Sequence, residues 1–313
     1  MDVPEIRELS YFVAVAEELH FGRAAQRLGI AQPPLSRAIQ QLERRMGVPL
    51  LERTSRSARL TPAGEVFLAE GRKVLDAATA AVRRARRAGQ DLPRLLVAMK
   101  PHGDAGLLEP ILRRYGLAPD SVEVEVVVCG IGEQAPMLRD GRVDVAFLHA
   151  PHDDLSGFDT ELLMTQDQVA MLPRNHRLAG RSALVLSDLD REPTPRWPSA
   201  HPPAAHPPAA DGIPHGAVPQ VRDTAQLMQL VALGRCVAVM PESVRDHARP
   251  DIVCVPLLDA PQTSVLLAWP DRTTSPVVAS FVRAAADVAQ AAVPAPAAPG
   301  WLREVGAEPR RGT

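Results

Sequence analysis

Arginine and glutamine side chains are concentrated near the amino terminus in a pattern suited to binding nucleic acid. The 41 residues from His20 to Leu60 carry eight arginines and only two acidic residues, a local charge of +6. Arginine can contact phosphates or donate two hydrogen bonds to guanine, and glutamine can pair with adenine. This segment is therefore a candidate DNA-binding module, although a solvated charged surface has the same composition. The eight arginines are Arg23, Arg27, Arg37, Arg44, Arg45, Arg53, Arg56 and Arg59.

Three short helices are predicted to position these side chains. Apolar residues recur at helical spacing over residues 4–19, and a second helix covers about residues 22–28 before Gly29. Because Pro33 and Pro34 are tolerated only at a helix start, the third helix begins there and ends at Met46. Two short helices, a glycine turn and a third helix are typical of a helix-turn-helix motif, here at about residues 21–40.

The third helix has one apolar face and one polar face. At ~100° per residue, its buried side is predicted to consist of Leu35, Ile39, Leu42 and Met46. The opposite side carries base-reading and phosphate-binding side chains, namely Arg37, Gln40, Gln41 and Arg44.

A small hairpin is predicted to follow this helix. Residues 50–53 and 58–61 flank a turn-forming run at residues 54–57. Arg53 and Arg56 lie at its tip, where they could reach a minor groove or the phosphate backbone as part of a wing.

These segments resemble the amino-terminal domain of LysR-type transcriptional regulators. The resemblance rests on FVAVA at 12–16, FGRAAQRL at 21–28, AQPPLSRAIQQLE at 31–43, LER at 51–53 and LTPAG at 60–64. It implies a winged helix-turn-helix DNA-binding domain over residues 1–61, with promoter DNA as the partner and the third helix in the major groove. The implied base and phosphate contacts are Gln32, Pro33, Ser36, Arg37 and Gln40, with Arg53 and Arg56 on the wing.

A long linker helix is predicted over residues 62–91. Thr61 and Pro62 are typical of its start, and it should continue to Ala88, a length of about 40 Å. Spacing by threes and fours predicts a coiled-coil seam that would form a homodimer, although a monomeric helix packed on its own domain is the alternative. The resemblance implies that this helix dimerises and that two dimers form a homotetramer. The seam residues are Phe67, Gly71, Val74, Ala78, Ala81 and Ala85.

Residues 92–292 alternate between predicted strands and helices, which indicates a parallel α/β sheet. Two such sets suggest two lobes joined by crossing segments: lobe I over residues 92–160 and 263–292, and lobe II over residues 161–262. Residues 293–313, rich in proline and alanine, are predicted to be a disordered tail.

Ligands of open α/β sheets bind beyond the carboxyl ends of strands and near helix amino termini. The residues at these positions are Lys100, Pro101, His102 and Gly103 after the first strand, Gly130, Ile131, Gly132 and Glu133 after the second, and Trp197, Asp223 and Thr224 in lobe II. Lys100 could neutralise a carboxylate, although a lone lysine at a strand end is also ordinary surface.

The family resemblance extends, more weakly, into this region. It rests on LRDGRVDVA at 138–146, LPRNHRLA at 172–179, LVALG at 230–234 and VMP at 239–241. It implies an effector-binding domain that folds like a periplasmic binding protein and holds a small, often anionic, inducer between its lobes. The family commonly has a small hydroxyl residue after the first strand, whereas this chain has Pro101 and His102.

Other functional classes are weakly supported. We find no Gly-x-Ser-x-Gly motif, phosphate loop or dinucleotide glycine pattern, so an enzyme is not expected. Cys129, Cys236 and Cys254 could form a redox switch, but core thiols fit them better. The proline-rich stretch at 193–219 contains histidines but no fixed ligand spacing, so we expect a surface loop and no metal or cofactor. The histidines considered are His176, His201, His206 and His215.

The overall charge conceals an asymmetry. The whole chain of 313 residues carries a net charge of -2, whereas residues 1–91 carry +4 and residues 92–313 carry -6. We find no apolar run long enough to span a membrane and no secretory signal, and the three cysteines are too few for a disulfide framework. We therefore expect a soluble cytoplasmic protein.

Overall fold

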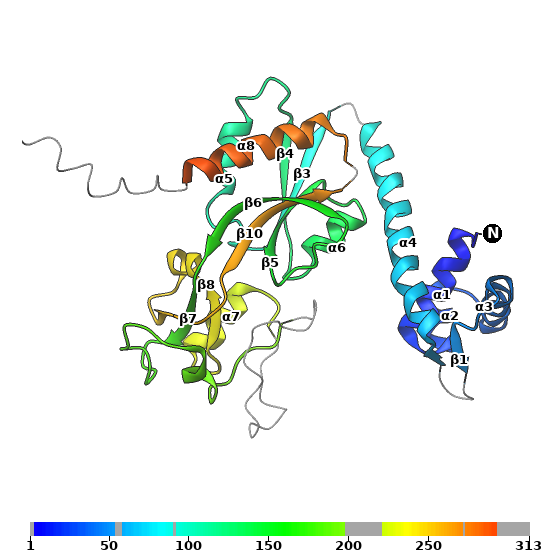
Figure 1. The fold of residues 1–313 in the computed structure, drawn as a ribbon, viewed down its shortest axis with the longest axis horizontal. Coiled ribbons are helices and arrows are strands. Elements are labelled where there is room, and N and C mark those ends of the chain that lie inside the picture. The colour runs from blue at the N-terminus through cyan, green and yellow to red at the C-terminus, as the bar shows by residue number, and fades with distance from the viewer. Residues whose placement is uncertain (1–2, 54–57, 90–91, 198–220, 272, 293–313) are drawn as a thin grey trace, which may run out of the picture.

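A computed structural model describes residues 3–53, 58–89, 92–197, 221–271 and 273–292 (Figure 1). The predicted tail at 293–313 and most of the proline-rich stretch, with His201, His206 and His215, lie outside the described residues. So does Arg56, at the tip of the predicted wing.

The amino-terminal domain is a winged helix-turn-helix, as the sequence predicts. Helices α1 (Ile6–Glu18), α2 (Phe21–Leu28) and α3 (Gln32–Met46) precede an antiparallel hairpin of β1 (Leu51–Arg53) and β2 (Ala58–Leu60). The third helix begins at Gln32, one residue earlier than predicted. The core of this domain contains Phe12 of α1. Of the predicted inner face of α3, Leu35, Ile39 and Leu42 are fully buried and Met46 is half-buried.

Local interactions explain where these helices begin and end. Gly29 and Gly47 end α2 and α3 with φ of 67° and 72°, a conformation that glycine adopts without steric cost. The side chain of His20 accepts hydrogen bonds from the N–H groups of Gly22 and Arg23 and so caps α2. Glu43 Oε1 accepts from the N–H groups of Leu50 (2.9 Å) and Leu51 (3.0 Å), which fixes the hairpin to α3.

Helix α4 (Pro62–Ala88) is the predicted linker helix, and its first turn is capped by Thr61, whose hydroxyl accepts from Gly64 N at 3.0 Å. Part of the predicted dimer seam is already covered within the chain. The Phe67 ring lies 5.0 Å from that of Phe12, and Gly71 faces Leu9 and Val13 of α1. The prediction that Phe67 and Gly71 belong to an intermolecular seam is therefore wrong, because α1 covers this end of α4.

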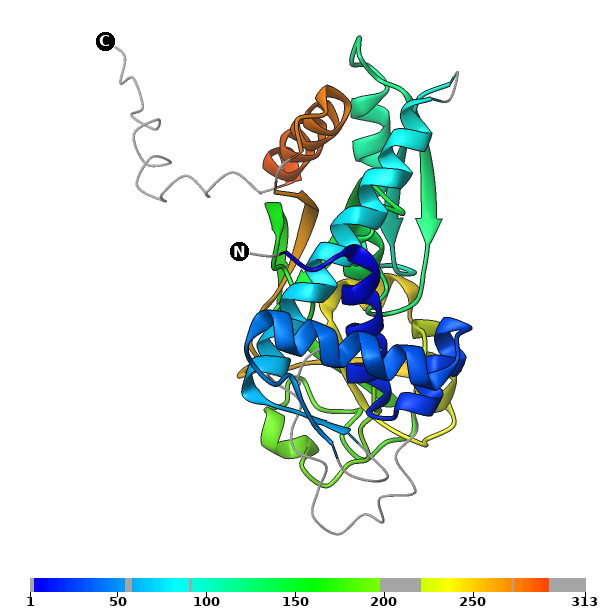
Figure 2. The same ribbon diagram turned by 90° about the vertical axis from the view of Figure 1, so that its right-hand side faces the viewer.

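Lobe I of the carboxy-terminal domain contains a five-stranded sheet with the order β4-β3-β5-β10-β6. Helices α5 and α8 pack on one face of this sheet, and α6 packs on the other, between the sheet and α4 (Figures 1 and 2). The strands are β3 (Arg94–Met99), β4 (Glu123–Val128), β5 (Val145–Ala150), β6 (Phe158–Gln166) and β10 (Thr263–Pro270), and the helices are α5 (Leu108–Tyr115), α6 (Gln134–Arg139) and α8 (Pro276–Ala292).

Lobe II is smaller and has a three-stranded sheet with the order β8-β7-β9. Its elements are β7 (Gln168–Pro173), β8 (Ala238–Pro241), β9 (Ile252–Pro256), helix α7 (Thr224–Ala232) and the 3-10 helices η1 (Leu186–Leu189) and η2 (Glu242–His247). The chain passes between the lobes twice, at Asp167 and over residues 257–262 (Figure 1).

The structure corrects two predictions about these lobes. The sheets are not wholly parallel: β3 is parallel to β4 and β5, but β10 is antiparallel to β5 and β6, and β7 is antiparallel to both its neighbours. The predicted lobe boundary at residue 160 falls inside β6, which pairs with β10 in lobe I as far as Gln166. Because only Asp167 separates β6 from β7, the chain crosses from one lobe to the other without a loop.

No helix in the described part of the chain is both long enough and apolar enough to cross a membrane.

The packing of α4 on the hairpin generates a test. A Cβ atom on Gly64 would lie 2.0 Å from the carbonyl oxygen of Leu50, so Gly64→Ala must push α4 away from the winged domain. We expect this variant to lose about 1–3 kcal/mol or more of stability, which is typical of overpacking. Thermal unfolding followed by circular dichroism measures the loss. Gly180→Ala is the control, because nothing lies within 4 Å of its Cβ position; equal stability of the two variants would contradict this account.

Candidate functional site

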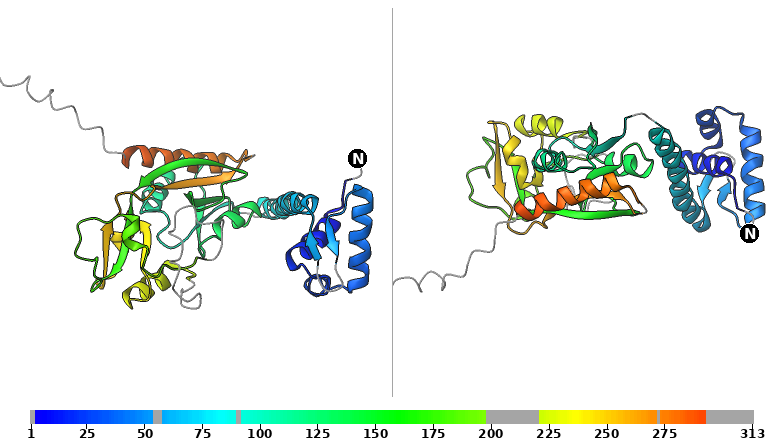
Figure 3. Two further views of the ribbon diagram at one scale, coloured as in Figure 1. Left: turned by 60° about the horizontal axis from the view of Figure 1, so that its bottom comes forward. Right: turned by 90° about the horizontal axis from the view of Figure 1, so that it is seen from above.

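Helix α3 lies on the outer side of the amino-terminal domain, away from the lobes (Figure 3). In Figure 2 the helix lies across the surface that faces the viewer. Ser36 is half-buried, and the other predicted contact residues on this helix are exposed: Gln32, Pro33, Arg37, Gln40, Gln41 and Arg44. The helix is thus held from its apolar side while the polar side remains accessible to a partner.

Ion pairing distinguishes the arginines of this domain. Arg23 and Arg27 contact Glu18 (3.2 Å) and Glu17 (2.7 Å), and Arg45 pairs with Glu8. By contrast, no hydrogen bond or ion pair joins the guanidinium of Arg37 or Arg44 to another residue in the described part of the chain. Three of the eight arginines therefore contribute to folding, while the outer face of α3 keeps uncompensated positive charge for phosphates or base edges.

One of these pairs also connects the domain to α4. Burial would raise the pKa of Glu17, but hydrogen bonds from Arg72 of α4 and Arg27 of α2 hold it below its ordinary value. Arg72 Nη2 lies 2.8 Å from Glu17 Oε1. The carboxylate thus orients α1, α2 and α4 together, and with them α3.

Arg53 is the last residue of β1, opposite Ala58 in the hairpin. The strand pairing places the end of β1 at the base of the turn, beside the segment that lies outside the described residues.

A second candidate site lies between the two lobes. The parallel strands β3, β4 and β5 end at one edge of the lobe I sheet. Beyond this edge is a cavity of about 830 Å³, lined by the loop after β4 and by the start of α7 from lobe II. Its lining includes six of the residues predicted from strand ends and helix starts: Pro101, Gly130, Ile131, Gly132, Glu133 and Asp223.

Several predicted residues do not line this cavity. Trp197 is partly buried and packs against the hydrophobic core of lobe II. Thr224 is buried in the first turn of α7. Lys100, His102 and Gly103 lie in the loop beside the cavity; Gly103 is buried against the Lys100 side chain, where a Cβ would meet Lys100 Cγ at 2.6 Å.

The structure adds Val128, Cys129, Arg222 and Ala225 to the lining. Arg222 and Ala225 flank Asp223, the N-cap of α7, so the helix-start rule that selected Asp223 could have found them. Cys129 directly follows β4 and precedes Gly130, and its place beside a strand suggests a core thiol. Cys129 does pack against the lobe I core, as that interpretation expects, but it also lines the cavity.

Charged groups around this cavity divide into two classes. Glu133 accepts from Gly130 N at 2.8 Å, and Asp223 accepts from Gln226 N at 2.7 Å, so both carboxylates stabilise local backbone. Among the described residues, no hydrogen bond or ion pair engages the side-chain nitrogens of Lys100 or Arg222. The uncommitted charges at this site are therefore positive.

Lys100 lies in an unfavourable environment for its charge. Burial lowers its pKa, and the nearby carboxylate of Asp153 only partly opposes this effect. Burial, together with the charge of Lys100, also holds the pKa of His149 well below its ordinary value, so this histidine is neutral at physiological pH. The buried Nδ1 of His149 has no hydrogen-bond partner among the residues that the structure describes. An anion beside Lys100 would relieve the cost of this buried charge.

His102 makes a direct contact between the lobes. Its ring stacks on that of His247 from η2, with 3.9 Å between centroids and 27° between planes. Burial and the neighbouring His247 both lower the pKa of His102, against the effect of Asp104. Protonation of His102 therefore opposes this contact.

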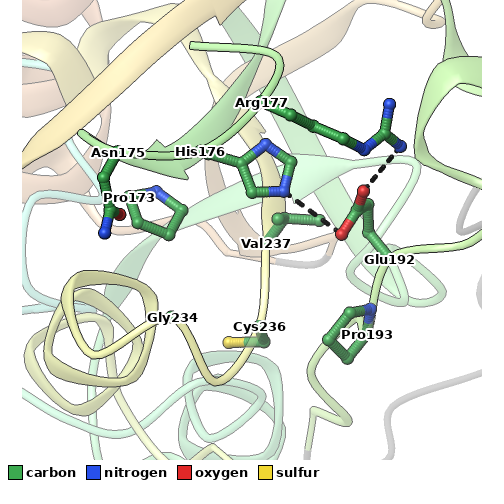
Figure 4. A pocket seen from close by; sticks show the side chains of 9 residues that line it. All are labelled: Pro173, Asn175, His176, Arg177, Glu192, Pro193, Gly234, Cys236 and Val237. Atoms are coloured by element: carbon green, nitrogen blue, oxygen red, sulfur yellow. Dashed lines mark hydrogen bonds and ion pairs between the residues drawn. The ribbon is translucent and has the colours of Figure 1, made fainter.

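A smaller cavity of about 320 Å³ lies within lobe II (Figure 4). Glu192 is its central charged group, but one carboxylate oxygen contacts His176 Nε2 (3.2 Å) and the other Arg177 Nη2 (2.7 Å). With its charges already compensated, and with none of the residues predicted from strand ends in its lining, this cavity is the weaker candidate for a ligand. His176, considered above as a metal ligand, instead pairs with Glu192 in this cavity.

Redox and metal chemistry find little support in the described residues. Burial raises the pKa of Cys129 and of Cys236 to about 11, so both thiols are protonated at neutral pH and react slowly. Burial also raises the pKa of Cys254. Within the same residues, no group of three or more histidine, cysteine or acidic side chains is arranged to hold a metal ion.

Two family models match the chain. The bacterial regulatory helix-turn-helix model of the LysR family matches residues 6–65, and the LysR substrate-binding domain model matches residues 88–290. The first covers the winged domain with the start of α4, and the second covers the end of α4 with both lobes. Members of this family are transcriptional regulators and not enzymes, and they bind promoter DNA and small-molecule effectors.

Known proteins agree with these matches. The chain is 31% identical to the transcriptional regulator BudR of Raoultella terrigena, over 89% of this chain and 99% of BudR. It is 33% identical to the transcriptional regulator AlsR of Bacillus subtilis, over 77% of this chain and 82% of AlsR. The crystal structure of CbnR, a LysR family transcriptional regulator, superposes with a TM-score of 0.54 at 26% identity, covering 91% of this chain and 99% of CbnR. The chain is therefore a LysR-type DNA-binding transcriptional regulator with a substrate-binding domain.

Proposed function

We propose that this regulator reads promoter DNA with α3 and responds to a small anionic inducer bound between its lobes. The observation that carries the first part is the exposed arginine and glutamine face of α3, whose arginines have no ion-pair partner among the described residues, whereas Arg23, Arg27 and Arg45 form ion pairs with acids of α1. Gln32, Pro33, Ser36, Arg37 and Gln40 make the base and phosphate contacts in this proposal, supported by Gln41 and Arg44 and by Arg53 and Arg56 on the wing.

The outer face of α4 supports a homodimer. Phe67 and Gly71 are covered by α1, but Val74 is 44% exposed and Ala81 and Ala85 also face solvent. Pairing of these small side chains with the same residues of a second copy would remove apolar surface from water and bring two α3 helices to one DNA duplex. Assembly of two such dimers into a homotetramer completes the proposal.

The inducer site is proposed from charge and shape together. The cavity between the lobes is lined by Arg222 and lies beside Lys100, and neither cation forms an ion pair or hydrogen bond with a carboxylate among the described residues. A carboxylate or similar anion would compensate both. By contacting both lobes, such a ligand would favour one arrangement of lobe II relative to lobe I. This preference is the basis of a ligand-dependent switch.

The DNA-binding proposal is tested by removing one unpaired arginine. If Arg37 reads a base, Arg37→Ala should weaken binding to DNA from upstream of the chain's own gene by about 1–3 kcal/mol. Arg235→Ala is the matched control, because Arg235 is exposed on lobe II and its substitution removes the same charge. Fluorescence anisotropy at a fixed salt concentration measures both. Equal affinities of the two variants would remove Arg37 from the interface.

The inducer proposal is tested with pairs of neutral and charged ligands. Small aromatic and aliphatic carboxylates are compared with their primary amides for their effect on the melting temperature. We expect at least one acid to stabilise the wild-type protein, by about 2.7 kcal/mol at a hundredfold excess over its Kd, while its amide does not. Lys100→Met should abolish this effect and Lys73→Met should retain it, because Lys73 pairs with Glu70 on α4, away from the cavity. Stabilisation by amides as strong as by acids would contradict an anionic inducer.

A further inference from the structure

The carboxyl-terminal half of α4 is packed tightly against lobe I of the same chain. Gly141, just after α6, lies against Ala80: a Cβ atom on Gly141 would come within 2.7 Å of Ala80 Cα. Gly141 also has φ of 73°, which disfavours any other residue. This contact therefore requires a glycine on the lobe and a small residue on the helix.

Two arginines of α4 hold the same contact from the next turns. Arg83 Nη1 lies 2.6 Å from Asp140 Oδ1 and also donates to the Asp140 carbonyl oxygen at 3.1 Å. Arg87 donates to the Gly141 carbonyl oxygen and to Asp144 Oδ1, both at 2.7 Å. We call these six residues the linker clamp: Ala80, Arg83, Arg87, Asp140, Gly141 and Asp144.

Asp144 extends the clamp into the sheet of lobe I. While one of its oxygens accepts from Arg87, the other accepts from Leu96 N of β3 at 3.1 Å. The side chains of Arg87 and Asp144 are only 22% and 19% exposed, so the pair is partly shielded from solvent and salt. Through this carboxylate, α4 and β3 keep a fixed relative orientation.

The clamp is one short helix away from the cavity between the lobes. The cavity loop ends at Glu133, α6 spans the next six residues, and Asp140 of the clamp follows at once. Helix α6 is firmly seated, because Ala135 and Leu138 are buried in the lobe I core and Glu133 is bonded at both sides, to Gly130 N and Met137 N. Because packed interiors deform little, a shift of the cavity loop must move α6 and with it Asp140 of the clamp, unless the clamp holds both in place.

We propose that the linker clamp transmits the state of the cavity to α4, and so to the orientation of the DNA-binding domains. The inference rests on the proposed function and names its route of regulation. Arg83 and Arg87 touch neither DNA nor ligand in this scheme; they couple the lobe that binds the ligand to the helix that carries the reading head.

Thermodynamic linkage makes this testable without knowledge of the inducer. If the cavity and the DNA-binding domain are coupled, DNA and a ligand in the cavity change each other's binding free energy by the same amount. DNA alone must therefore shift the conformations that the cavity adopts. Cys129 lies at the cavity wall next to the loop, so its rate of alkylation by N-ethylmaleimide reports on that loop. Cys254 lies in β9 of lobe II and serves as the internal reference.

The experiment uses the full chain with a duplex from upstream of its own gene and, separately, an unrelated duplex. Peptide mass spectrometry follows alkylation of Cys129 and Cys254. We expect the specific duplex to slow alkylation of Cys129 about fivefold or more, the range of typical allosteric coupling, because fixing α4 restrains α6 and the loop. The rate at Cys254 should be unchanged.

Arg87→Ala should bind the specific duplex yet lose its effect on Cys129. Arg83→Ala, as a second clamp variant, should lose most of it, and circular dichroism confirms that both variants are folded. Arg84→Ala is the matched control, because Arg84 is exposed on the same helix and no hydrogen bond or ion pair engages it in the described part of the chain. It should retain the effect of the duplex.

Two results overturn the proposal: a specific duplex that binds wild-type protein without changing the Cys129 rate, or an effect that survives in both clamp variants. A chain that binds no specific duplex in the anisotropy assay contradicts the proposed function itself, and with it this inference.

Discussion

The packing of helix α4 at its two ends is the constraint on which the rest of the molecule depends. At one end, Gly71 and Phe67 seat α4 against α1, and Arg72 joins Glu17. At the other end, Ala80, Arg83 and Arg87 seat it against lobe I. A single helix thus contacts both the domain with the polar face of α3 and the domain with the cavity. Because α4 packs on both domains, a change in how α4 sits on lobe I must also reorient the amino-terminal domain.

Charge is distributed in accordance with this division. The near-neutral total of the chain conceals a basic amino-terminal segment and an acidic remainder. The structure sharpens the contrast further, because Arg23, Arg27 and Arg45 are paired with acids while Arg37 and Arg44 are not. The outer face of α3 therefore carries exposed positive charge that no acid of the described residues compensates and that would meet phosphates, while an acidic sensor domain is repelled from DNA.

Local signals predicted most of the fold, and long-range pairing accounts for what they missed. Helix ends were readable because Gly29, Gly47 and Thr61 act through their own backbone or side chain. The direction of β10 could not be predicted, because a strand that returns after residues 161–262 can pair in a parallel or an antiparallel direction with the same apolar pattern. Strand β6 lies at the edge of the sheet, and its polar residues interrupt the apolar alternation by which a strand is predicted from sequence. Likewise, strand-end rules found the lobe I side of the cavity, but Trp197 belongs to a core that only tertiary packing defines. The apolar spacing of α4 also could not show whether Phe67 packs against its own chain or against a second one.

The central claim is that two α3 helices, held apart by paired α4 helices, read one duplex while the lobes sense a ligand. Hydroxyl-radical footprinting of the full chain on DNA from upstream of its own gene tests it most directly. The account predicts two protected patches on one face of the duplex, with centres about 10 base pairs or a multiple of that distance apart. A single patch, or protection no different from that on unrelated DNA, would contradict it.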